Sequence, residues 1–69
     1  MSVARITEIK SSSPKSFDDA VEKGVSRANK TLKNVRGAWV KEMEVECGKN
    51  GKITEYRVLL KVTFILNDD

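Results

Sequence analysis

Residues 52–66, KITEYRVLLKVTFIL, decide the fold, because side chains of two kinds alternate along the whole stretch. An alternation of period two is typical of a β-strand. One face of this strand is apolar or aromatic and carries Tyr56, Val58, Leu60, Val62, Phe64 and Leu66. The other face is mixed and carries Ile53, Glu55, Arg57, Leu59, Lys61, Thr63 and Ile65. We predict that the first face packs against a helix.

A second long strand precedes this one. Gly48-Lys49-Asn50-Gly51 contains the Asn-Gly pair of a tight hairpin turn, and residues 36–47 again have period two. One face of residues 36–47 holds Gly37, Trp39, Lys41, Met43, Val45 and Cys47. The other face holds Arg36, Ala38, Val40, Glu42, Glu44 and Glu46. The two strands should therefore form a hairpin.

The chain before the hairpin predicts one helix and one further strand. Apolar and small residues recur at three-and-four spacing, as on the buried stripe of a helix, at Phe17, Ala20, Val21, Gly24, Val25, Ala28, Leu32 and Val35. Ser16 and Asp19 have the spacing of a capping box that begins this helix. Residues 3–10 alternate loosely and favour a strand, which the run Ser11-Ser12-Ser13-Pro14 should break.

These elements predict an α+β fold in a single domain, residues 1–69. The order is β-α-β-β, with a three-stranded antiparallel sheet and one helix packed across one face. The other sheet face should then expose an apolar set: Trp39, Met43, Val45, Leu59 and Ile65. An apolar face of this kind marks a ligand site or a contact between subunits, so we predict a homo-oligomer. The pattern leaves open which of the two roles Trp39 has.

Composition argues against several classes of function. The net charge of +3 comes from scattered lysines and arginines rather than a basic block, so we expect no nucleic-acid partner. No stretch is apolar enough for a membrane span or a signal peptide, and the lone Cys47 fits a reducing compartment, so we expect a cytoplasmic protein. The sequence has no histidine, the usual general base, and we predict that it is not an enzyme.

The order and spacing of several motifs resemble the dodecin family over nearly the whole chain. They are the serine-rich turn 11–17, the segment Ala28-Asn29-Lys30-Thr31-Leu32, a strand that carries a tryptophan, and a last strand that opens on Tyr56-Arg57-Val58 and closes on Val62-Thr63-Phe64. The resemblance implies a hollow homododecamer that stores and sequesters a flavin, riboflavin or FMN, without turnover. It also implies that flavin rings stack between tryptophans of symmetry-related subunits.

The resemblance and the residues together suggest a site made of Trp39, Arg57, Gly37 and Lys41. Aligned through Thr31-Leu32, the stacking tryptophan of the family falls on Gly37, and Trp39 lies two residues later on the same face, about 7 Å along the strand. A glutamine of the family falls on Arg57, which can donate to a flavin carbonyl but cannot accept from the ring N–H. Lys41 and Lys61 share the face of Trp39, either to meet a phosphate or as ordinary strand lysines.

An alternative is a flavin-free shell that binds metal ions or another small ligand. The resemblance extends to calcium-binding dodecins, which have arginine at the positions of Arg57 and Trp39. Carboxylates for a hard cation are available on Glu42, Glu44, Glu46 and Glu55, although the same residues also fit a solvated strand edge. We assign no metal ligand from the sequence.

Overall fold

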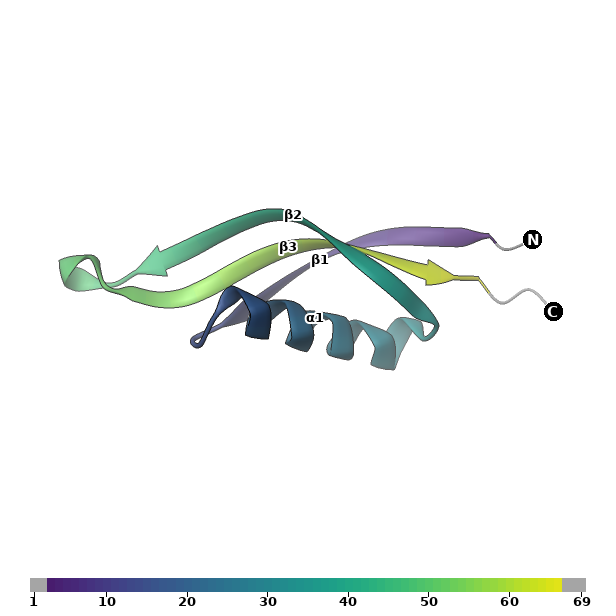
Figure 1. Cartoon of the computed structure of the whole chain (residues 1–69), viewed down its shortest axis with the longest axis horizontal. Helices are drawn as coiled ribbons and strands as arrows, with labels where there is room; N and C mark the ends of the chain where they lie inside the picture. Colours follow the sequence, from purple (N-terminus) through teal and green to yellow (C-terminus); the bar gives the residue numbers. More distant parts are fainter. Residues whose placement is uncertain (1–2, 67–69) are drawn as a thin grey trace.

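The structure confirms the predicted order of elements and the predicted sheet. It is a computed structural model in which residues 3–66 are described. The strands form one antiparallel sheet in the order β1-β3-β2, and α1 lies across one face of it (Figure 1). The elements are β1 (Ala4–Ser13), α1 (Phe17–Leu32), β2 (Val35–Cys47), the 3-10 turn η1 (Lys49–Gly51) and β3 (Ile53–Ile65).

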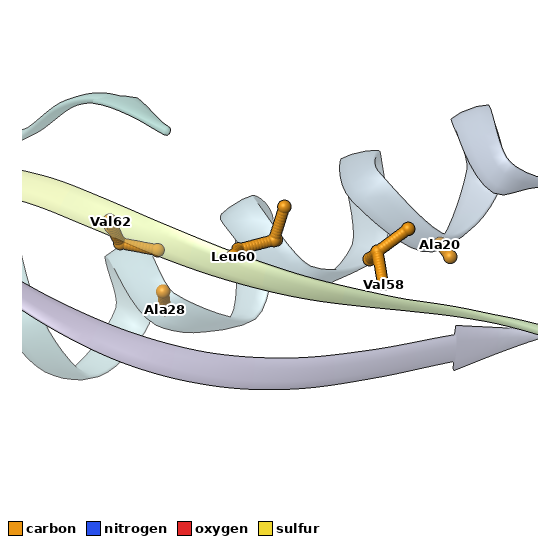
Figure 2. Packing of buried hydrophobic residues seen from close by; sticks show 5 residues of the cluster. All are labelled: Ala20, Ala28, Val58, Leu60 and Val62. Carbon is orange, nitrogen blue, oxygen red and sulfur yellow. The ribbon is translucent and has the colours of Figure 1, made fainter. Parts of the chain in front are cut away.

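The core forms where the apolar face of β3 meets the small-residue stripe of α1. Val58, Leu60 and Val62 are at most 1% exposed, and Ala20 and Ala28 of the helix pack against them (Figure 2). As the middle strand, β3 has neighbours on both edges, and alternation turns every second side chain toward the helix. The predicted packing face of residues 52–66 is confirmed.

The helix begins at its predicted cap. The Ser16 hydroxyl accepts a hydrogen bond from the Asp19 backbone N–H at 3.0 Å, but the Asp19 carboxylate turns to Ser13 instead of completing a capping box. The helix ends at Leu32, because Lys33 and Asn34 adopt positive φ values of 59° and 53°. Val35, predicted as the last residue of the helical stripe, therefore lies in β2.

The prediction that the serine run breaks the first strand was wrong. Ser11, Ser12 and Ser13 continue β1 and pair with Val58, Arg57 and Tyr56 of β3. Two of their hydroxyls bind the start of the helix: Ser11 Oγ donates to the Ala20 carbonyl at 2.8 Å, and Ser13 Oγ donates to the Asp19 carboxylate. Paired hydroxyls of this kind let a polar run remain in the sheet under a helix.

The predicted faces of the second strand hold only for its first half. The pairing with β3 shifts by one residue between Val40 and Glu42, which leaves Lys41 as a β-bulge. After the bulge, Met43 lies opposite Val58 and Val45 opposite Tyr56, on the helix side of the sheet. Met43 and Val45 are therefore not on the face of Trp39, and our prediction for them was wrong.

The bulge also reverses the prediction for the acidic residues of β2. Glu42, Glu44 and Glu46 lie opposite Leu59, Arg57 and Glu55, on the face away from the helix. The hairpin turn itself is as predicted, since Asn50 and Gly51 take positive φ values of 68° and 73°. The turn projects beyond the first turn of α1 (Figure 1).

Asp19 makes the stability of the fold depend on pH. The hydrogen bond from Ser13 and the contact of Lys23 Nζ, 3.2 Å away, hold the pKa of Asp19 below its ordinary value of 3.8. A lowered pKa means that the ionised carboxylate stabilises the fold above that ordinary value, and that this contribution disappears as the pH falls through the folded-state pKa. We expect Asp19→Asn to lower the thermal midpoint at neutral pH and to approach the wild type in strong acid. Asp18→Asn, exposed in the same turn, is the control, and an Asp19→Asn deficit that persists unchanged in strong acid would contradict the assignment.

Gly24 should be required by the close contact between α1 and the sheet. A Cβ on Gly24 would lie 2.9 Å from Ser11 Cβ and 3.0 Å from Leu60 Cδ1. Overpacking a tight core costs about 1–3 kcal/mol, and alanine recovers about 1 kcal/mol of helix propensity. Gly24→Ala should therefore lower the free energy of unfolding by about 1 kcal/mol, measured at fixed protomer concentration. Ser26→Ala, an exposed substitution in the same helix, should not lower it; equal behaviour of the two variants would refute the packing argument.

Candidate ligand site on the open face of the sheet

The sheet face away from α1, here called the open face, carries the only tryptophan of the chain. Trp39 lies opposite Lys61 of β3, and Lys61 lies opposite Glu8 of β1, so the three side chains form one row across the sheet. Trp39 is 70% exposed to solvent. A large aromatic residue left this open on a sheet marks a surface for a ligand or a partner.

Charged side chains share the open face with the indole. Lys61 Nζ lies 5.7 Å from the centroid of the Trp39 ring, within the range of a cation–π contact. Lys41 Nζ binds Glu8 Oε2 at 3.2 Å, reaching from one edge strand to the other. The bulge at Lys41 places its side chain on the open face, close in sequence to Trp39. The predicted association of Lys41 with the face of Trp39 is confirmed.

Gly37 leaves free space beside the indole. It lies on the open face opposite Thr63, and Ile6 completes this row with an exposed side chain. A Cβ added at Gly37 would meet nothing within 4 Å, so packing inside the chain does not require glycine here. Next to Trp39, the surface therefore has no side chain at Gly37, is apolar at Ile6 and is open to an approaching molecule.

Arg57 shares the open face but lies away from Trp39. It is four residues along β3 from Lys61, the partner of Trp39, which is about 13 Å at strand spacing. Its guanidinium lies 3.1 Å from Glu55 and 3.0 Å from Glu46, and these carboxylates raise the pKa of Arg57. Within one chain, the structure brings Gly37, Trp39 and Lys41 together and separates Arg57 from them.

Of the two charged residues in the Trp39 row, the sequence predicted the position of one and not of the other. Lys61 is placed on this face by the period-two pattern, whereas Glu8 was missed. The pairing of β1 with β3 brings Glu8 to Lys61, and no local pattern in residues 3–10 encodes that register. The missing signal is long-range pairing, which a single sequence does not carry.

One cavity of the structure lies away from Trp39. A groove of about 580 Å³ runs between α1 and the edge strand β1, with Ile9, Ala28 and Leu32 among its apolar lining and Lys23 and Arg27 among its charged lining. It is on the helix side of the sheet and contains none of the four predicted site residues. It forms because one helix is narrower than the sheet it covers.

The carboxylates of the open face do not form a metal site inside one chain. Across residues 3–66, no group of three or more His, Cys, Asp or Glu side chains is placed to hold a metal ion. Glu46 and Glu55 bind Arg57, and Glu44 binds Lys10 Nζ at 3.0 Å. In the same described range, α1 is too short and too polar to cross a membrane.

Comparisons with known proteins agree on one family. The sequence profile of the dodecin family matches residues 3–67. Calcium dodecin of Mycobacterium tuberculosis is 38% identical over 64 residues, which cover 93% of this chain and 89% of that protein.

Solved structures share the fold as well as the sequence. Dodecin from Streptomyces davaonensis superposes with a TM-score of 0.91 at 33% identity, covering 97% of both chains. An arginine-to-alanine variant of the Thermus thermophilus dodecin gives 0.89 at 31% identity, over 99% of this chain and 100% of that chain. The M. tuberculosis calcium dodecin, a calcium-chelating antigen, gives 0.81 at 31% identity, over 97% of this chain and 94% of that chain.

The fold and the open face define a subunit of a small ligand-binding homo-oligomer: a thin core, one covered sheet face, and one face left for other molecules. The chain belongs to the dodecin family. The resemblance read from the sequence is thus confirmed, together with the β-α-β-β fold and its assembly into oligomers. Subunit number and ligand stay predictions.

Proposed function

We propose that the protein binds and sequesters a flavin without turnover, in a homododecameric shell, with the isoalloxazine ring stacked on Trp39. The observation that carries this proposal is the 70% exposed indole beside Gly37, a position with no side chain and no neighbour for one. The pair offers a flat aromatic surface and the space for a flat ligand next to it.

Symmetry supplies the second half of such a site. In a two-fold contact between identical subunits, the same patch of each faces the other, so two Trp39 rings approach each other across the axis. A planar ligand between them gains stacking of about 0.5–1.5 kcal/mol per aromatic pair beyond the burial of its surface. An electron-rich indole in contact with an excited flavin also quenches its emission, so storage and protection follow from one contact.

The position of Trp39 suggests a variant of the family arrangement. The stacking tryptophan that the resemblance implies falls on Gly37, and Trp39 lies two residues further on the same face, opposite Lys61. We propose that the ring of the ligand shifts with it, by about 7 Å along β2. The space above Gly37 then lies beside the ring rather than beneath it.

Arg57 takes part only from a neighbouring subunit. A ring stacked on Trp39 is about 13 Å along the sheet from Arg57 of the same chain, further than the side chain extends while it binds Glu46 and Glu55. Lys41 is the closer cation, and its pairing with Glu8 fixes it at the edge of the site. We propose no catalytic role for either residue.

Calcium binding is the second candidate, favoured by the M. tuberculosis relative and by the four glutamates that β2 and β3 place on the open face, Glu42, Glu44, Glu46 and Glu55. Three of them, Glu44, Glu46 and Glu55, bind Lys10 or Arg57, which offsets their charge. Among residues 3–66, Glu42 makes no such ion pair. Calcium needs about six to eight oxygen ligands, so this candidate requires copies of Glu42 to meet at a symmetry axis.

A titration of ligand-free protein with riboflavin and FMN tests the leading proposal. Flavin and tryptophan emission should fall together to a saturable stoichiometry, because Trp39 is the sole tryptophan. Trp39→Ala should weaken binding about ten-fold through lost stacking and burial, whereas Trp39→Phe should retain most of the affinity. Phe17→Leu, an aromatic change on the helix side, is the control. Unchanged emission at saturating micromolar flavin would remove the flavin proposal.

Calcium is tested separately by calorimetry and thermal melting of the flavin-free oligomer. A selective calcium site would stabilise the folded protein and raise its thermal midpoint. If the protein binds flavin and not calcium, millimolar calcium should change the midpoint no more than millimolar magnesium does. Glu42→Gln and, as a control on the helix, Glu22→Gln should then behave alike. A saturable calcium effect that chelation reverses and only Glu42→Gln abolishes would establish the second candidate instead.

A further inference from the structure

We propose that the outer edge of β2 in one subunit pairs with the free edge of β1 in the next, so that Met43 and Val45 fill the groove between α1 and β1. The partner is a second copy of this chain, and the contact differs from the two-fold contact proposed at Trp39. This inference rests on the proposed shell, which needs a second kind of contact because a two-fold contact by itself ends at a dimer.

β1 offers a regular free edge with a groove beside it. It is an outer strand of the sheet, and its pairing with β3 runs without a shift from Ala4 to Ser13. Every second backbone amide of such a strand points away from β3 and is free to pair with another strand. On the helix side, the groove of about 580 Å³ is apolar at Ile9, Ala28 and Leu32. An added strand would therefore find hydrogen bonds along β1 and room for every second side chain.

The opposite edge of the sheet carries side chains that suit this groove. Val40, Met43 and Val45 of β2 lie on the helix side, yet α1 leaves them 38%, 56% and 40% exposed. Between two register shifts, Glu42–Glu46 pairs with β3 residue by residue, so this part of the outer edge is regular enough to join another strand. The segment cannot reach the groove of its own subunit, because β3 separates β2 from β1.

The faces of the two edges agree. Met43 and Val45 lie on the helix side of β2, and the groove lies on the helix side of β1. Joining β2 of one copy to β1 of the next therefore continues the sheet, with both helices on the same side of it. A contact between two different edges is head-to-tail, and repeated copies of it can close into a ring.

The charges of α1 favour a head-to-tail contact over a contact between identical edges. Arg27 lines the groove on the β1 side of the helix, and Glu22, five residues earlier, lies about 140° away around the helix axis. Among residues 3–66, neither side chain has an ion-pair partner. Across the added strand, the β1 side of one helix faces the β2 side of the next, which brings Arg27 toward Glu22. Pairing of β1 with a second β1 would bring Arg27 toward Arg27.

Hydrogen exchange of the intact, ligand-free oligomer tests the contact without any substitution. The β1 amides that point away from β3 should exchange at least about 100-fold more slowly than unpaired amides, because the added strand accepts their hydrogen bonds. If these amides exchange as fast as solvent-exposed ones, the β1 edge is free in the oligomer and the inference is wrong.

A substitution in the hairpin identifies the segment that covers β1. Met43→Glu adds a charge at an exposed position, and we expect the assembly to dissociate to smaller species at micromolar concentration in analytical ultracentrifugation, with loss of the β1 protection. Ile53→Glu is the control, because Ile53 is an exposed apolar residue of the same hairpin on the open face, and it should retain the full assembly. Retention of both the assembly and the β1 protection by Met43→Glu would show that another segment, or another protein, occupies the groove.

The result can be separated from that of the flavin titration. Slow β1 exchange in a protein that binds no flavin would uphold this contact and remove the flavin proposal. Fast β1 exchange in a protein that binds flavin would remove this contact and uphold the flavin proposal. Dissociated Met43→Glu that still quenches riboflavin emission would support both, because Trp39 and Gly37 stay together within one subunit.

Discussion

One helix can cover only one face of a three-stranded sheet, and the molecule is organised around that limit. Val58, Leu60 and Val62 of the middle strand are sealed against Ala20 and Ala28, with Gly24 allowing the helix to approach the strands. The core is thin, and the long hairpin extends past the helix (Figure 1). A chain of this size cannot hide its second face by itself, so that face is available for neighbouring subunits and ligands.

The β-bulge at Lys41 decides which side chains occupy that face. Without the extra residue, the apolar Met43 and Val45 would stand beside Trp39, and the acidic residues of β2 would face the helix. With the bulge, the open face carries the aromatic Trp39 on one part and ion pairs on the part nearer the hairpin turn. In these ion pairs Glu44 binds Lys10, and Glu46 and Glu55 bind Arg57. One inserted residue thus divides the face into a stacking half near Gly37 and an ionic half near the hairpin turn.

This division bears on the choice between the two proposed ligands, flavin and calcium. A hard cation needs several unpaired carboxylates, and the ionic half already satisfies most of its own with lysine and arginine. A planar ring needs one exposed aromatic surface and empty space, and both are present at Trp39 and Gly37 within a single chain. The proposed flavin site therefore requires less of the assembly than a calcium site would, because Trp39 and the space at Gly37 are already together in one subunit.

The sequence by itself determined the element types, the packing face of β3, the capped helix and the Asn-Gly turn, because each depends on residues close along the chain. It also placed Gly37, Trp39, Lys41 and Lys61 on one face, since period two holds up to the bulge. Only the tertiary structure decided the rest: the continuation of β1 through its serines, the transfer of Met43 and Val45 to the helix side, the meeting of Glu8 with Lys61, and the distance from Trp39 to Arg57. Each of these depends on the register between strands distant in sequence, which is fixed by hydrogen bonds and packing that no local pattern contains.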